Sequence, residues 1–148
     1  MIYIGIDPGV KGGIAVIGES FTKAYPMPTT TKEKNGLLAI LCTTRATAIV
    51  EKVQVMGRAF GAKAALSYGQ GYGELIGILT ALDCKIVEVA PATWKKGMNV
   101  NSDKNTSILK AERLFPEVSL YPSERCKKPS DGLAEALLLA EYGRRMNL

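Results

Sequence analysis

The chain has 148 residues, of which 47% are hydrophobic, and its formal net charge is +5 at pH 7. This size predicts one domain, residues 1–148, and the composition excludes both a disordered and a membrane-spanning chain. The sequence contains no histidine, which excludes Ser-His-Asp catalysis and imidazole-based zinc sites, so hydrolysis here would depend on carboxylates and a hard metal ion.

The first predicted element is an apolar strand, residues 2–6, that ends in a carboxylate and a turn. Its residues are mostly β-branched or aromatic, as in a strand buried on both faces. Asp7 closes the strand, Pro8 and Gly9 form the turn, and the apolar run 14–17 predicts a hairpin partner. Asp7 is either a turn-capping residue or a functional acid beside glycines that let a phosphate or metal approach, and this stretch leaves both interpretations open.

The next segments predict an edge strand followed by polar chain. Residues 20–25 form the predicted strand, which two prolines end. The polar, charged residues 29–35 predict an exposed loop, and 37–42 predict a short helical patch.

A second buried strand, residues 46–51, again ends in a carboxylate, Glu51. If this strand lies parallel to the first and next to it, Asp7 and Glu51 meet at the carboxyl edge of the sheet, where open α/β folds bind ligands. Basic residues and Phe60 follow in residues 52–64. This segment is either a solvated loop or a phosphate-binding surface with one ring available for stacking on a base.

A helix is predicted at residues 64–82, and it contains several glycines between Gly69 and Gly73. Their spacing, and the lack of a preceding strand, exclude a dinucleotide-binding loop. Each glycine within a helix costs roughly 1 kcal/mol relative to alanine. We therefore expect this helix to pack closely on the sheet or on another helix.

Another strand is predicted at residues 85–89 and precedes the only tryptophan, Trp94, which we assign to the core. A helix capped by Ser102 and Asp103 runs to about residue 114. A polar loop, residues 117–130, follows this helix.

The last predicted helix begins near Ser130 and has a strongly apolar face. Asp131 and Glu135 lie at i,i+4 on one side of its first turns, where like charges repel. The helix N-terminus favours the charge of Asp131, but a metal ion explains both acids better.

Three of these features together resemble the RuvC Holliday junction resolvases: the strand-Asp-Pro-Gly opening, the strand ending in Glu51, and the final helix Asp131-Gly-Leu-Ala-Glu135-Ala-Leu-Leu-Leu-Ala. The stretches Gly69–Gly73 and Pro91–Lys96 resemble the compact RuvC-like resolvases of bacteriophages, so the resemblance covers essentially the whole chain. It implies an α/β, ribonuclease-H-like fold with a five-stranded mixed sheet of order 3-2-1-4-5 and helices on both faces. It also implies a homodimer that cuts two like-polarity strands of a four-way junction.

The resemblance implies that Asp7, Glu51, Asp131 and Glu135 hold two Mg²⁺ ions, or Mn²⁺ in their place, roughly 4 Å apart for phosphodiester hydrolysis. In one respect the chain departs from the family: the bacterial enzymes generally carry their last two acids as Asp-x-x-Asp, one residue closer than Asp131 and Glu135. The residues expected to contact branched DNA are basic or aromatic: Lys11, Arg58, Phe60, Lys63, Lys95, Lys96 and Lys104. Whether Phe60 stacks on DNA or only packs within its loop is left open.

Three other classes share some of these features. An actin-like ATP-binding fold also opens with an acid and glycines, but it needs two domains. A nuclease of the same fold that processes ribosomal RNA and a junction-binding protein without catalysis stay open as alternatives. Three cysteines without a CxxC pattern, and a strand at the very start, lead us to expect a cytoplasmic protein, in the bacterial host if the chain is from a phage, with no membrane partner.

Overall fold

The structure is a computed structural model and describes residues 1–43, 45–52 and 61–148. At its centre lies a mixed sheet of five strands in the order β3-β2-β1-β4-β5, which confirms the predicted order. β1 pairs antiparallel with β2 and parallel with β4, and β4 pairs parallel with β5. The strand bounds are β1 Ile2–Asp7, β2 Gly13–Ile17, β3 Thr22–Pro26, β4 Ala46–Glu51 and β5 Lys85–Val89.

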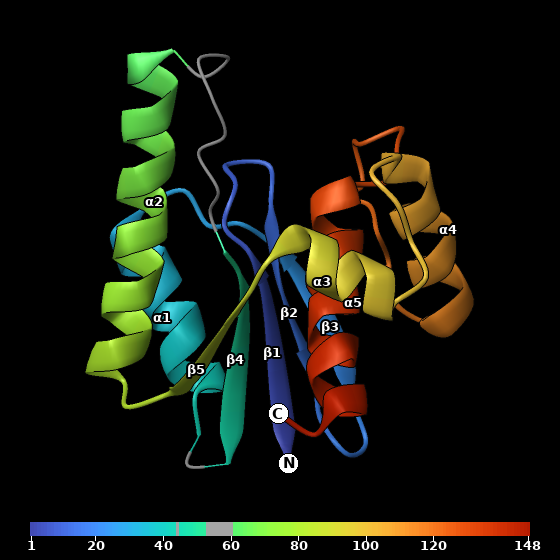
Figure 1. Ribbon diagram of the computed structural model, residues 1–148, viewed down its shortest axis with the longest axis horizontal. Helices are drawn as coiled ribbons and strands as arrows, with labels where there is room; N and C mark the ends of the chain where they lie inside the picture. Colours follow the sequence, from blue (N-terminus) through green and yellow to red (C-terminus); the bar gives the residue numbers. More distant parts are fainter. Residues whose placement is uncertain (44, 53–60) are drawn as a thin grey trace.

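Helices cover both faces of the sheet, as predicted (Figure 1). One face carries α1 and α2, which pack on each other, and the other carries α5, with α4 packed against it and α3 beside it. The helix bounds are α1 Thr31–Leu41, α2 Ala62–Ala81, α3 Pro91–Gly97, α4 Lys104–Leu114 and α5 Asp131–Met146. No helix in the described part of the chain is long and apolar enough to cross a bilayer.

Strand β1 alternates between two hydrophobic clusters, because successive side chains of a strand point to opposite faces. Ile4 and Ile6 are fully buried in the cluster beneath α1 and α2. Tyr3 belongs to the cluster beneath α5. Burial on both faces explains why this strand is a nearly continuous apolar run.

Two glycines allow α5 to lie directly against β1 and the turn that follows it. A Cβ at Gly5 would overlap the backbone of Ala136 in the middle of α5, and a Cβ at Gly132 would overlap the carbonyl oxygen of Lys11. Ser130 caps the helix by accepting a hydrogen bond from the backbone N–H of Leu133. The first turn of α5 is therefore held against the chain that follows Asp7.

Helix α1 begins at Thr31, so the loop predicted for residues 29–35 is wrong over most of its length. Thr30 accepts a hydrogen bond from the backbone N–H of Glu33, whose carboxylate accepts one from the backbone N–H of Thr30. This capping box satisfies backbone donors that would otherwise lack a partner, and it starts a helix in a polar segment.

The packing around the glycines of α2 also differs from expectation. A Cβ added at Gly69, Gly71, Gly73 or Gly77 would meet no atom within 4 Å. Helix α2 does pack on α1, as expected, but within the described chain this packing does not use the glycines. Among the residues that the structure describes, the side of α2 that carries Gly69, Gly73 and Gly77 is exposed and uncovered.

Candidate active site

Two acidic side chains lie at the same edge of the sheet because of the strand directions. Asp7 ends β1 and Glu51 ends β4, and the two strands are parallel neighbours in which Ile6 is paired with Val50. Helix α5 begins with Asp131 beside the turn that follows β1 and presents Glu135 one turn later. We call Asp7, Glu51, Asp131 and Glu135 the acidic cluster.

Asp7 has the most perturbed ionisation in this cluster. Burial, followed by the charges of Glu135 and Glu51, raises its pKa from 3.8 to about 7, and the charge of Asp131 adds to the rise. A hydrogen bond of 3.4 Å from the backbone N–H of Gly9 to Oδ1 of Asp7 acts in the opposite direction. All three other acids are thus near enough to disfavour a charge on Asp7.

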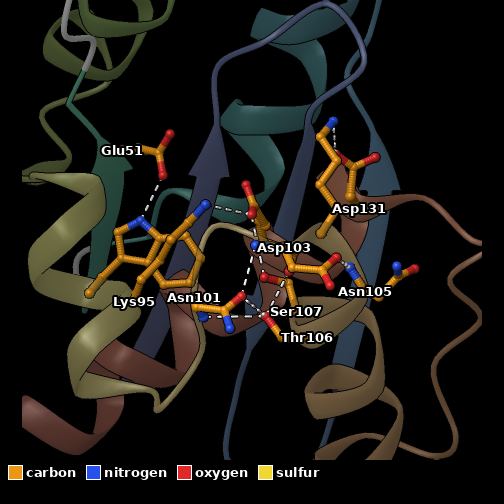
Figure 2. A network of polar contacts seen from close by, with 11 residues as sticks. Glu51, Lys95, Asn101, Asp103, Asn105, Thr106, Ser107 and Asp131 are labelled. Atoms are coloured by element: carbon orange, nitrogen blue, oxygen red, sulfur yellow. Dashed lines mark hydrogen bonds and ion pairs between the residues drawn. The ribbon is translucent and has the colours of Figure 1, made fainter.

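Glu51 is anchored by the tryptophan of α3. The Trp94 indole donates from Nε1 to Oε2 of Glu51 over 2.6 Å (Figure 2). Burial raises the pKa of Glu51, the Trp94 hydrogen bond lowers it, the charge of Glu135 raises it and that of Lys95 lowers it, with burial prevailing. Glu51 is therefore a partly buried acid held in one orientation.

The acids of α5 are paired with lysines. Lys95 Nζ lies 2.8 Å from Oε1 of Glu135, which also accepts a hydrogen bond of 3.3 Å from the Ser107 hydroxyl. Lys104 forms an ion pair with Asp131 at the start of α5 (Figure 2). In this structure lysines supply the positive charge that the spacing of the two acids requires.

The ligand atoms of the acidic cluster suit a metal ion, but their present spacing does not enclose one. Within residues 1–43, 45–52 and 61–148, no three acidic or cysteine side chains converge closely enough to enclose an ion. The donor chemistry nevertheless fits a hard divalent cation, because the cluster offers only carboxylate oxygens. Burial first, and then the charges of the other acids, disfavour the charged form of Asp7 and raise its pKa, so a bound cation would stabilise that charged form. Metal binding would require Glu135 and Asp131 to exchange their lysine partners for the ion.

The residues expected to contact DNA are only partly brought together. Lys95 and Lys104 lie in the acidic cluster through their ion pairs, and Lys96 is exposed on the same short helix as Lys95. Lys11 is exposed in the turn after β1, and Lys63 is exposed in the first turn of α2. Arg58 and Phe60 lie outside the described residues.

Sequence reasoning missed three partners of the acidic cluster. Trp94 was assigned to the core, and it is fully buried, but its N–H also binds Glu51. Ser107 carries no sequence signal that connects it with Glu135. Burial and the charges of Asp7, Glu51 and Glu135 raise the pKa of Tyr68 on α2 to about 12, which places this ring near the acids.

The raised pKa of Asp7 predicts that the metal-free protein becomes less stable to unfolding as the pH rises. Asp7 loses its proton near pH 3.8 in the unfolded state and near pH 7 in the folded state. The protonated Asp7 therefore contributes its full stability below about pH 3.8, and this contribution is lost as the pH rises through 7. Asp7→Asn should therefore raise the free energy of unfolding near pH 8 by a few kcal/mol, on the order of three pKa units at 1.36 kcal/mol each, and much less near pH 4.

Urea unfolding in EDTA at both pH values measures this difference. Asp83→Asn is the matched control, because Asp83 is an exposed turn residue with φ of 53°, which asparagine also tolerates. Equal changes in the two variants at pH 8 would show that Asp7 is not a buried charge.

Two comparisons of the sequence gave no result: no family model matches the chain, and no curated protein matches it. Solved structures do match its fold. The chain has the RuvC type of ribonuclease-H-like fold, with its five-stranded sheet in the order 3-2-1-4-5.

Two of the similar structures are of RuvC from Thermus thermophilus. One, RuvC in complex with a Holliday junction substrate, is 20% identical with a TM-score of 0.63, and the match covers 99% of this chain and 96% of that one. The other, RuvC by itself, is also 20% identical with a TM-score of 0.59, covering 99% and 97%. Neither comparison distinguishes a bacteriophage branch, which stays a prediction.

Proposed function

We propose that the protein is a divalent-metal-dependent endonuclease that resolves four-way DNA junctions. The observation that carries this proposal is the acidic cluster: four carboxylates from β1, β4 and α5 at one edge of the sheet, three of which raise the pKa of the fourth. Supporting it, a similar fold occurs in a RuvC in complex with a Holliday junction substrate. The match extends over nearly the whole of both chains.

In the proposed mechanism, Asp7, Glu51, Asp131 and Glu135 would hold two Mg²⁺ ions. When bound, such ions supply an activated water and stabilise the charge of the leaving oxygen and phosphate. The protein's own part is to orient the carboxylates. The Gly9 N–H contacts Asp7, and the Trp94 N–H contacts Glu51. Lys95 and Lys104, which pair with two of these acids, would also be placed to neutralise phosphates of DNA bound at the cluster.

The test is cleavage of four labelled substrates with and without Mg²⁺: a four-way junction, a replication fork, linear duplex DNA and structured RNA. Mg²⁺-dependent, paired cuts in the junction support the proposal. Preferential cleavage of RNA would support the ribosomal-RNA nuclease instead. Tight junction binding without any cleavage in Mg²⁺ or Mn²⁺ would support a binding protein.

The exposed lysine of α3 is expected to contribute affinity through phosphate contact. Lys96→Ala should reduce the slope of log affinity against log salt by about 1, because one fewer counterion is released. Lys85→Ala is the matched control, since Lys85 is also exposed but begins β5 at the opposite end of the sheet. Junction binding measured over a salt series checks this, and unchanged affinity and slope in Lys96→Ala would show that Lys96 is only solvated.

The second part of the proposal is a homodimer that uses the open side of α2. Paired cuts on a two-fold junction require two sites related by symmetry, which an isologous dimer provides. Gly69, Gly73 and Gly77 are exposed at intervals of four residues, so they lie on one side of the helix. Leu66, which continues this side, is 63% exposed. A second copy of α2 could approach closely there.

The dimer predicts different effects of two arginine substitutions. Gly73→Arg should convert the dimer to a monomer at micromolar concentration, because a long charged side chain would enter the interface. Gly36→Arg in α1 is the matched control: Gly36 is also an exposed helical glycine, and a Cβ added there would meet no atom within 4 Å. Sedimentation equilibrium measures both. A wild-type protein that stays monomeric on junction DNA would contradict the dimer.

A further inference from the structure

Trp94 combines complete burial with a short hydrogen bond to an acid of the cluster. Its side chain has no exposed area, and it belongs to the hydrophobic cluster beneath α5. Its N–H lies 2.6 Å from Oε2 of Glu51 (Figure 2). A leucine or phenylalanine would fill a purely apolar position without a polar atom, whereas a buried indole N–H needs an acceptor. Here that acceptor is a carboxylate of the proposed metal site.

The backbone around Trp94 is tied to the same sheet edge as Glu51. Val89, the last residue of β5, is paired with Glu51, and its carbonyl oxygen accepts a hydrogen bond of 2.8 Å from the Lys52 N–H. Helix α3 starts two residues later, at Pro91. The distance between the indole and the carboxylate is therefore set by a short, hydrogen-bonded connection.

The other end of α3 is fixed against α5. A Cβ at Gly97 would overlap the ring of Tyr142, so the two helices touch there without room for a side chain. The next residue after Trp94 reaches the same helix, because Lys95 pairs with Glu135 and its Nζ lies 5.2 Å from the centre of the Trp94 ring. Trp94 thus contacts an acid of β4, and the next residue, Lys95, contacts an acid of α5.

We propose that Trp94 is a positioning residue for the metal site, whose N–H holds the Glu51 carboxylate in the orientation that binds the cation. This inference rests on the proposed function, because it needs the acidic cluster to bind a divalent ion. Trp94 touches neither the substrate nor the ion. By engaging Oε2 alone, it restricts the rotation of the Glu51 side chain and leaves Oε1 outside this bond. Removing such a partner from a metal-binding side chain typically weakens metal affinity by about 10- to 100-fold.

The decisive experiment removes the N–H and keeps the shape of the ring. Trp94 is the only tryptophan, so a tryptophan auxotroph can replace this one indole by a benzothiophene, in which sulfur stands in place of N–H. The matched control carries 5-fluorotryptophan, which perturbs the ring but keeps the donor. Mn²⁺ affinity is measured from the electron paramagnetic resonance signal of the free ion, and melting in EDTA checks the fold.

The benzothiophene protein is expected to bind Mn²⁺ at least about 10-fold more weakly than the wild type, with the fluorinated protein close to the wild type. Wild-type affinity in a folded benzothiophene protein would overturn the positioning role. Junction cleavage by the wild type would in that case leave the proposed function in place. A wild-type protein that neither binds Mn²⁺ nor cleaves junctions would overturn both proposals.

A second measurement decides the case in which the benzothiophene protein does not fold. The single indole gives one N–H cross-peak in an ¹⁵N-correlated spectrum of the native protein. A shift of this peak that saturates with Mg²⁺, and that Glu51→Gln abolishes, supports the proposal. A peak that does not move while Mg²⁺ saturates the protein overturns it.

Discussion

Asp7→Asn is expected to reduce junction cleavage by at least about 10³-fold, the upper range for removing one group that stabilises transition-state charge. Asp7 ends a strand at the edge of the sheet, and its carboxylate contacts the Gly9 N–H rather than filling the core. The amide has nearly the same shape, so the fold and junction binding should persist. Single-turnover cleavage and a binding assay on the same junction measure the two effects separately.

Asp83→Asn is again the control and should cleave like the wild type. Glu51→Gln should behave like Asp7→Asn, because the two carboxylates lie on neighbouring parallel strands. Near-normal cleavage by either variant would remove the two-metal proposal. Loss of cleavage together with loss of the folded state would instead indicate a structural role.

The second large effect concerns the acids of α5, where Glu135→Gln is expected to reduce cleavage more severely than Asp131→Asn. Only 11% of the Glu135 side chain is exposed, against 33% for Asp131. Lys95 and Ser107 hold Glu135, whereas Asp131 pairs with a largely exposed lysine. We expect losses on the order of 10³-fold for Glu135→Gln and about 10-fold for Asp131→Asn.

Mg²⁺ titration of the cleavage rate distinguishes the two acids further. A true ligand, when removed, shifts the Mg²⁺ requirement upward, and this shift should be larger for Glu135→Gln. The matched control is Glu112→Gln, an exposed acid on α4. If Glu135→Gln keeps the wild-type rate and Mg²⁺ dependence, Glu135 is not a ligand and the proposed set must be redrawn.

The strands could be predicted from local patterns, whereas their order was expected only from the resemblance to the RuvC resolvases. Residues 2–6 and 46–50 are apolar enough to be buried strands, and a glycine-containing turn joins the first to a hairpin partner. Once these strands are parallel neighbours, Asp7 and Glu51 must meet at one edge, whatever the rest of the chain does. The apolar face of α5 similarly predicts a helix buried against the sheet.

The start of helix α1 could have been predicted from the local sequence but was missed. The threonine and glutamate of the α1 capping box are three residues apart in the sequence, but the surrounding charged residues indicated a loop. The α2 glycines were misjudged for a different reason. Their positions are local, but whether another backbone lies beside them depends on how the chain packs, and within the described structure nothing does.

By itself, then, the sequence determined most of the strands and helices, because periodicity and turn chemistry act over a few residues, whereas the order of the strands was expected only from the resemblance to the RuvC resolvases. Only the tertiary structure decided the partners of the four acids. Trp94 lies 43 residues from Glu51, and Ser107 lies 28 residues from Glu135. No spacing rule connects residues so far apart, since their contact depends on where α3 and α4 pack against α5 and on the burial that makes each polar atom require a partner.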